Sequence, residues 1–293
     1  MAAGAPGALA GLLSPLSLLL AGLIPFLVGT LLAGVAGFEV RLKIVGAGAL
    51  AVAALILAAG ASRQAFSPGA GRWPTWGSRS LVGAGRLAYG SLTLAAFLGL
   101  LLQFGWHTGD LTIPLGGLGI LGGYFYFAPP LAWHRRGWGE AVGGLCFGLL
   151  PVVSGFYLQC GHLVTEVLLY GLPLTFAAFN LFLLQGFPNP QQEAQPQRHN
   201  LAEILGPAAG ALIYTLVNIL TITGLVFCLF LPPSPLPLRG GLWLLLLLAI
   251  VNQELIKRKA YRQESRLKLL GRLTLTLHLS MGLMFTLMLW RRL

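Results

Sequence analysis

The chain has 293 residues, of which 56% are hydrophobic and only 9% are charged, and its formal net charge is +11. Soluble domains carry about 25% charged residues, so this composition excludes a water-soluble globular fold, which needs more polar surface. The cations follow a membrane topology, described below, and therefore do not require a nucleic-acid partner.

The apolar residues occur in long blocks, and one bilayer span needs about 20 of them. In chain order we place nine blocks, at residues 8–36, 43–62, 84–104, 111–128, 140–160, 165–186, 206–231, 238–253 and 269–290. The short alternating segments typical of membrane β-barrels are absent from the sequence. The sequence therefore predicts an all-α integral membrane protein with nine transmembrane helices, which form a single domain over residues 1–293.

Lys and Arg residues are concentrated in the even-numbered loops between these blocks. The second, fourth, sixth and eighth loops, with the adjoining span ends, contain 14 of the 19. Positively charged loops stay in the cytoplasm, so we predict a cytoplasmic N-terminus and a C-terminus outside, in a bacterial inner membrane. The eighth loop, after residue 253, is also dense enough in cations to contact anionic lipid headgroups.

Two segments interrupt the apolar pattern. The first reads Gly-Tyr-Phe-Tyr-Phe-Ala-Pro-Pro at residues 123–130 and continues with Arg-Gly-Trp-Gly-Glu at residues 136–140. The second, residues 185–206, begins Gln-Gly-Phe-Pro-Asn and ends Ala-Glu-Ile-Leu-Gly. These segments resemble the UbiA superfamily of intramembrane prenyltransferases, particularly its menaquinone-type branch. That branch commonly has a Tyr-Phe/Tyr-x-Ala-Pro-Pro stretch followed by Arg-Gly-x-Gly-Glu at the start of the fifth span.

The resemblance implies a helical bundle around a central cavity that faces the lipid, and a chemistry in which a polyprenyl group leaves a diphosphate for an aromatic acceptor. In the family, aspartate-rich loops after the second and sixth spans hold the diphosphate through Mg²⁺, which prefers carboxylate oxygens. The matching positions here are Ser62 and Ala65 in the first loop, and Asn189 and Glu193 in the second. Glu193 alone cannot build a two-metal site, so Mg²⁺ is expected only if the protein is catalytically active.

Two hypotheses follow from this departure. In the first, the chain has lost the Mg²⁺–diphosphate site and binds an isoprenoid lipid, a quinone or a pigment, by itself or as a subunit of a membrane complex. In the second, it is an active polyprenyl transferase of quinone or related biosynthesis whose cations hold the diphosphate directly, since guanidinium groups bind phosphate well. The candidate diphosphate- or headgroup-binding residues are Arg63, Arg72, Arg135, Arg136, Arg198 and His199. The positive-inside rule by itself also accounts for cations in these loops.

The candidate cavity residues are Tyr124, Tyr126, Asn180, Gln185 and Asn189. Prenyl chains pack well on aromatic rings, although tyrosines near span ends also anchor helices at the membrane interface. An intramembrane asparagine more often bonds a neighbouring helix than a ligand.

A third hypothesis is transport, which usually needs charged groups inside the spans. The centres of the predicted spans contain almost none, and His278 in the last block is the exception in type. An imidazole there either ligates a haem or chlorin metal or hydrogen-bonds a neighbouring helix.

The two family loops lie four spans apart. This spacing suggests a duplicated four-helix unit, roughly residues 8–128 and 140–253, followed by a ninth helix at residues 269–290. No clear repeat is visible at the level of single residues.

Overall fold

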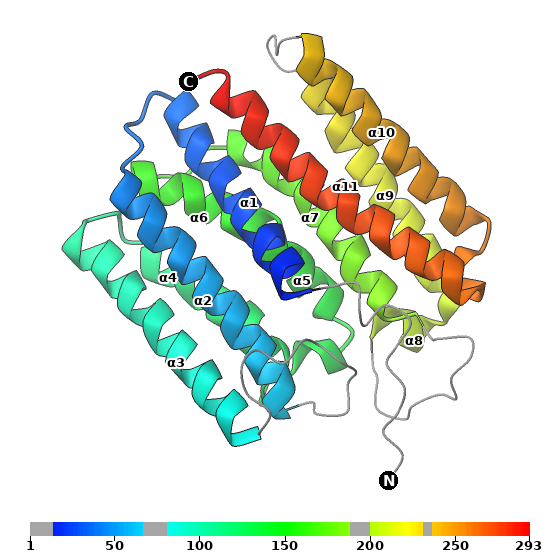
Figure 1. Ribbon diagram of the computed structural model, residues 1–293, viewed down its shortest axis with the longest axis horizontal. Helices are drawn as coiled ribbons and strands as arrows, with labels where there is room; N and C mark the ends of the chain where they lie inside the picture. The colour runs from blue at the N-terminus through cyan, green and yellow to red at the C-terminus, as the bar shows by residue number, and fades with distance from the viewer. Residues whose placement is uncertain (1–13, 67–80, 188–199, 231–235) are drawn as a thin grey trace.

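The computed structural model describes residues 14–66, 81–187, 200–230 and 236–293 (Figure 1). All regular elements in these ranges are helical. They are α1 (Pro15–Val35), α2 (Leu42–Phe66), α3 (Leu81–Leu100) with the π-helical turn η1 (Leu101–Gly105), α4 (Thr112–Gly123), the 3₁₀ turns η2 (Tyr124–Tyr126) and η3 (Trp133–Arg135), α5 (Gly139–Phe147), α6 (Leu149–Cys160), α7 (Glu166–Gln185), α8 (Leu201–Leu205), α9 (Pro207–Leu229), α10 (Leu236–Lys257), the 3₁₀ turn η4 (Ala260–Arg262) and α11 (Glu264–Trp290).

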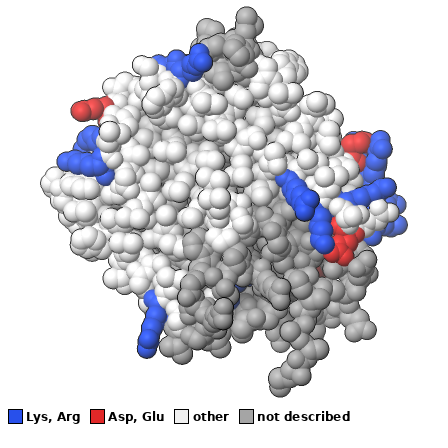
Figure 2. Space-filling model, viewed as in Figure 1, with Lys and Arg blue, Asp and Glu red and all other residues white. Residues whose placement is uncertain are grey.

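Eight helical segments of the described chain are long and apolar enough to cross a bilayer, with lengths of 18 to 27 residues. They are α1, α2, α3 with η1, α5 with α6, α7, α9, α10 and α11. Their exterior is largely apolar, and in Figure 2 the charged side chains lie towards the edges of the molecule. The predicted all-α membrane protein is confirmed.

The fourth predicted span differs from the other eight. Residues 111–128 contain α4, which has 12 residues and is therefore about 18 Å long, against about 30 Å of hydrocarbon. The chain then tightens into η2 and reaches the cis peptide bond between Pro129 and Pro130. Proline disfavours the helical conformation of the residue before it, so the double proline keeps this helix short. Nine full-length spans are consequently not confirmed.

The fifth predicted span is a broken helix. Gly148 separates α5 from α6 with φ −122° and ψ −92°. The Thr175 hydroxyl on α7 accepts a hydrogen bond from the Leu149 N–H at 2.8 Å and donates one to the Gly171 carbonyl at 2.8 Å. Backbone polar groups inside a bilayer need partners within the protein, so Thr175 makes the break tolerable.

The first and sixth helices cross at two glycines. An added Cβ on Gly29 would lie 1.9 Å from the Val152 carbonyl oxygen, and one on Gly155 would lie 2.0 Å from the Phe26 carbonyl oxygen. Small residues let helix backbones approach closely in lipid. The largest buried cluster lies beside this crossing and joins α1, α6, α7, α9, α10 and α11. We call these helices the core side, and we call α2, α3 and α4 the cavity side.

The start of α1 and the end of α11 lie at opposite ends of the bundle (Figure 1). The C-terminal Leu293 contacts the other end of α1, where its side chain would meet a Cβ added to Gly34. The end of α11 therefore lies beside the end of α1 and away from its start.

Candidate functional site: a mouth and an apolar cavity

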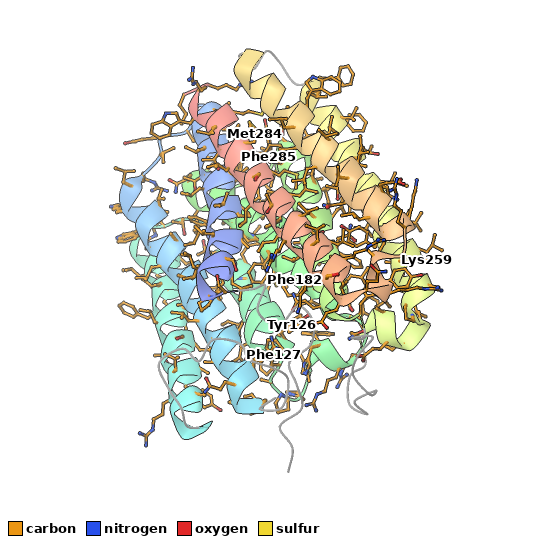
Figure 3. All side chains as sticks on the ribbon, turned by 45° about the vertical axis from the view of Figure 1, so that its right-hand side comes forward. Tyr126, Phe127, Phe182, Lys259, Met284 and Phe285 are labelled. Carbon is orange, nitrogen blue, oxygen red and sulfur yellow. The ribbon has the colours of Figure 1, made fainter. Side chains whose placement is uncertain are left out.

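One end of the bundle carries a cluster of aromatic and basic side chains, which we call the mouth: Arg63, Tyr126, Phe127, His134 and Phe182. The Arg63 guanidinium lies 5.4 Å from the centre of the Phe127 ring, within cation–π range. The Phe127 and His134 rings are 5.0 Å apart, and Tyr126 lies 5.8 Å from Phe182. Figure 3 shows Tyr126, Phe127 and Phe182 side by side near the helix ends. The mouth is thus an aromatic surface with a cation on it.

The imidazole of His134 is held in one neutral form. Its Nδ1 lies 2.7 Å from the Tyr126 carbonyl oxygen, and its Nε2 accepts a hydrogen bond from Arg135 Nε at 3.2 Å. An acceptor at Nε2 requires that the proton be on Nδ1. Burial lowers the pKa of His134 below its usual 6.5, and the cations of Arg135 and Arg63 add to this effect, while the Tyr126 hydrogen bond opposes it. The mouth therefore gains no charge from His134 at neutral pH.

The loop that carries the mouth is held by polar contacts on both sides. Arg136 donates a hydrogen bond to the Pro130 carbonyl at 2.8 Å. The buried Glu140 carboxylate accepts one from the Leu201 N–H, at the start of α8, at 2.9 Å. Glu140 thereby joins the two segments that interrupt the apolar pattern of the sequence. Residue types alone did not mark this carboxylate as a link, although it closes the Arg-Gly-Trp-Gly-Glu stretch.

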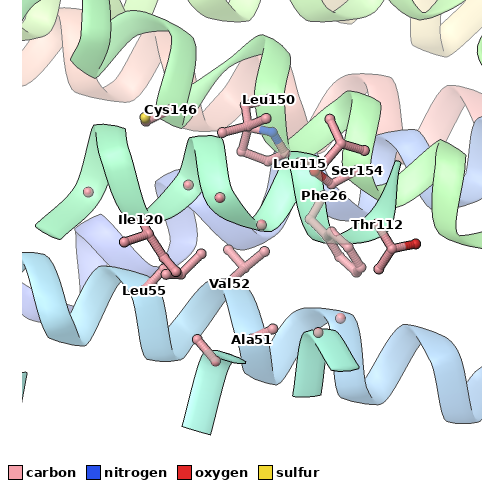
Figure 4. Close-up of a pocket in the computed structure, with 18 of the residues that line it drawn as sticks. Phe26, Ala51, Val52, Leu55, Thr112, Leu115, Ile120, Cys146, Leu150 and Ser154 are labelled. Carbon is pink, nitrogen blue, oxygen red and sulfur yellow. The ribbon is translucent and has the colours of Figure 1, made fainter. Parts of the chain in front are cut away.

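A cavity of about 330 Å³ lies between α2, α3, α4 and the broken α5–α6 span (Figure 4). Its wall is almost entirely apolar and includes Val52, Leu55, Ile120 and Leu150. Small-ligand sites have volumes of about 300–1,000 Å³ and mostly apolar walls. Broken membrane helices commonly line such sites. The cavity therefore suits a hydrocarbon chain.

Glycines keep this cavity open. A Cβ on Gly99, Gly116 or Gly117 would meet no atom within 4 Å, although all three residues line the wall. At the end of the cavity nearer the mouth, the wall includes Ala59 and Gly123. Ala59 lies one helical turn before Arg63, and Gly123 directly precedes η2. The cavity thus extends along α2 and α4 as far as the mouth.

A model of the UbiA prenyltransferase family matches residues 22–277. The chain belongs to the UbiA prenyltransferase family. The predicted resemblance to this family and the UbiA-like bundle are thereby confirmed, whereas the menaquinone-type branch stays a prediction. No match was found among the curated proteins.

Solved structures share the fold of this UbiA family member at low sequence identity. An apo UbiA homologue from Aeropyrum pernix K1 superposes with a TM-score of 0.67 at 16% identity, over 91% of this chain and 96% of that one. A digeranylgeranylglyceryl phosphate synthase gives 0.66 at 12% identity, over 94% and 93%. A UbiA homologue from Archaeoglobus fulgidus bound to GPP and Mg²⁺ gives 0.54 at 14% identity, over 93% and 99%.

Ser62, which the sequence resemblance places at an acid position of the first aspartate-rich loop, lies near the end of α2. Ser62 is fully buried there, and its hydroxyl lies 2.9 Å from the Ala59 carbonyl oxygen and 3.2 Å from the Tyr124 carbonyl oxygen. These contacts tie α2 to η2. A carboxylate in place of Ser62 would face two carbonyl oxygens that repel it. The region is therefore built around a hydroxyl donor.

The other predicted site residues have varied positions. Tyr124 is buried against the Phe66 and Phe125 rings, beside the mouth. Arg135 and Arg136 are exposed. Asn180 donates to the Tyr214 carbonyl on α9 at 3.2 Å, so it bonds a neighbouring helix. Gln185 is half-buried at the last residue of α7. Five candidates lie outside the described residues: Arg72, Asn189, Glu193, Arg198 and His199.

Of the two roles predicted for His278, the structure shows the hydrogen bond to a neighbouring helix. Its Nε2 lies 3.2 Å from the Ala21 carbonyl oxygen of α1. Over the ranges that the structure describes, no group of three His, Cys, Asp or Glu side chains is arranged to hold a metal ion.

Proposed function

We propose that this UbiA family member binds an amphiphilic isoprenoid, such as an isoprenoid lipid, a quinone or a pigment, and does not use a two-metal diphosphate site. The headgroup would lie against the mouth, and the apolar chain would occupy the cavity. The menaquinone-like stretch at residues 123–140 favours an aromatic or quinone headgroup, which stacks on the rings of Tyr126 and Phe127.

The continuity of the two features carries this proposal. The apolar cavity reaches Ala59 and Gly123, and the aromatic and basic mouth begins within one helical turn of both. A molecule with a polar head and a hydrocarbon tail matches that change from polar to apolar surface. Neither feature needs a metal ion.

The described residues do not fit Mg²⁺. Ser62 replaces a carboxylate of the family pattern, and its hydroxyl is engaged by backbone carbonyls. Mg²⁺ prefers carboxylates and phosphates as ligands. Loss of the diphosphate site is therefore our proposal for this chain, in which Glu193 is the only acid at the four positions that match the family's acids.

A second candidate is an active prenyl transferase with an atypical site. A UbiA homologue of the same fold binds GPP and Mg²⁺, and Arg63 is placed at the mouth where it can pair with a diphosphate. In this reading Arg63 and Arg135 neutralise the leaving group. The reading is wrong if Arg63→Ala and Glu193→Gln both leave the rate of transfer unchanged.

One experiment separates the two candidates. The purified protein is assayed for prenyl transfer with and without Mg²⁺, and its bound lipids are extracted and identified by mass spectrometry. We expect a stoichiometric isoprenoid, quinone or pigment and no product. Product that disappears with a chelator would overturn the proposal and support the second candidate.

The orientation of the chain in its membrane, and the identity of that membrane, are also part of the proposal. We infer that the mouth faces the cytoplasm and the C-terminus lies outside, in a bacterial inner membrane, because most cations of the described chain lie at the mouth end. Two four-helix units, and membership of a membrane complex, stay predictions. Cysteine labelling from each side of the membrane, at Gly137 beside the mouth and at Leu293, tests the orientation.

A further inference from the structure

The turn between α10 and α11 is the most strongly charged surface of the described chain. Its cations are all exposed: Lys257, Arg258, Lys259, Arg262, Arg266, Lys268 and Arg272. We call residues 257–272 the basic hairpin. Figure 2 shows blue side chains gathered at the right-hand edge, where Figure 1 places this turn, and Figure 3 labels Lys259 at its tip.

Few carboxylates offset this charge. Arg258 pairs with Glu254 at 2.9 Å, and Lys268 pairs with Glu264. Both pairs join residues four apart and lie at or near the surface, where ion pairs contribute little. The remaining five cations of the hairpin have no carboxylate within ion-pair distance in the parts of the chain that are described. The hairpin thus keeps a large uncompensated positive charge.

Buried side chains in and beside the hairpin anchor it to the bundle. Ile256, Ala260 and Leu267 are buried in one cluster with residues from α7, α8 and α9. Tyr261 packs on Phe187, with ring centres 5.6 Å apart. The cations therefore project from an ordered turn, so little conformational entropy of the backbone is lost when they bind a ligand.

Two features indicate that the charge has a role beyond local folding. Lys259 has φ +57°, a conformation that glycine or asparagine adopts more easily than lysine does. Arg266 and Lys268 lie near the start of α11, where the helix dipole disfavours cations. Membrane orientation requires only an excess of cations on one side, which less costly positions would also supply.

The position of the hairpin points to its partner. α10 and α11 both have the length and composition of membrane spans, so their connecting turn lies at the membrane surface. Leu269 is exposed directly beside Lys268. An apolar and a basic side chain thus lie next to each other, which matches the acyl chain and the anionic headgroup of a phospholipid. Basic clusters adjacent to spans attract anionic headgroups.

We propose that the basic hairpin is a binding site for the headgroups of anionic phospholipids. The phosphates pair with Lys257, Lys259, Arg262 and Arg266, and the acyl chains lie against the exposed faces of α10 and α11. This site is separate from the mouth and cavity and does not depend on the function proposed for them.

The test uses the full chain in nanodiscs of phosphatidylcholine mixed with phosphatidylglycerol. Native mass spectrometry counts the phosphatidylglycerol molecules that the released protein retains. The neutral variant is Lys257→Gln, Arg262→Gln and Arg266→Gln together. The charge-preserving variant has Lys257→Arg, Arg262→Lys and Arg266→Lys. The positional control is Arg291→Gln with Arg292→Gln, which removes exposed cations at the opposite end of the bundle.

We expect affinity for phosphatidylglycerol to fall at least about tenfold in the neutral variant, since each cation near a membrane surface contributes about fivefold. Wild-type retention should also fall as NaCl rises, because salt screens the attraction. The charge-preserving variant and the positional control should retain lipid as the wild type does. Equal retention by the neutral variant would overturn the proposal. So would displacement of the lipid by soluble pyrophosphate at matched ionic strength, because the site would then be one for a soluble anion.

Discussion

The two sides of the molecule use glycine in opposite ways. On the core side, Gly29 and Gly155 bring the backbones of α1 and α6 into contact, so no space is left for a Cβ. On the cavity side, Gly99, Gly116 and Gly117 adjoin open space. The same small residue therefore stabilises a helix crossing in one place and maintains an empty volume in the other. Substitutions on the two sides should differ accordingly, in stability on the core side and in ligand binding on the cavity side.

The largest effect is expected at the core crossing. Gly29→Ala would place a methyl group 1.9 Å from the backbone oxygen of Val152, which cannot move without separating the helices. We expect the free energy of unfolding to fall by about 3 kcal/mol or more, measured by thermal unfolding in detergent. The matched control is Gly46→Ala on α2, where a Cβ meets nothing and helix propensity favours alanine. Equal midpoints for the two variants would contradict the close crossing.

Filling the cavity should change binding and leave stability nearly intact. Gly116→Phe directs a ring into open space in the cavity wall. We expect about a tenfold loss of co-purified isoprenoid, with an unfolding midpoint close to that of the wild type, measured by lipid extraction and thermal unfolding. Gly90→Phe is the control, because Gly90 also has open space on α3 but does not line the cavity. Undiminished lipid in Gly116→Phe would exclude this cavity as the chain site.

Buried amides on the core side should have a smaller effect, and on stability alone. Asn218 donates from its side chain to the Ala249 carbonyl and to Gln253 Oε1, both at 2.9 Å. Hydrogen bonds between membrane helices contribute about 0.6 kcal/mol on average. We expect Asn218→Ala to lower the free energy of unfolding by about that amount and to retain bound isoprenoid. A loss of lipid without a loss of stability would move the binding site to the core side.

The mouth should show a shallow pH dependence. The pKa of folded His134 lies below 6.5, so the unfolded chain takes up a proton first as the pH falls. His134 therefore contributes its stability in full above about pH 6.5, and the contribution declines as the pH drops from there towards the folded pKa. Unfolding midpoints measured at a series of pH values should reveal this decline, and His134→Gln should reduce it. A decline of the same size in the variant would assign it to other groups.

Much of this protein followed from sequence patterns, for identifiable physical reasons. Long apolar blocks have to become helices in lipid because backbone polar groups need partners, and eight of the predicted spans are present as helices of spanning length in the described residues. The stretch at residues 123–140 carried the family resemblance, and the family match covers it. Asn180 and His278 make the helix-to-helix hydrogen bonds that intramembrane polar residues usually make.

Tertiary contacts decided what the patterns left open. The Glu140 carboxylate accepts a hydrogen bond from the Leu201 N–H at the start of α8, 61 positions away along the chain. No local pattern could predict this contact. The Ser62 hydroxyl contacts the Tyr124 carbonyl oxygen of η2. At the helix break, the Leu149 N–H donates a hydrogen bond to the Thr175 hydroxyl of α7. The opposite roles of Gly29 and Gly116 depend on which helix lies across from each. The sequence by itself determined the helical membrane fold and the family, since hydrophobicity and local motifs act along the chain. Only the tertiary structure decided where glycines leave space and where polar groups meet, because both depend on distances between residues far apart in sequence.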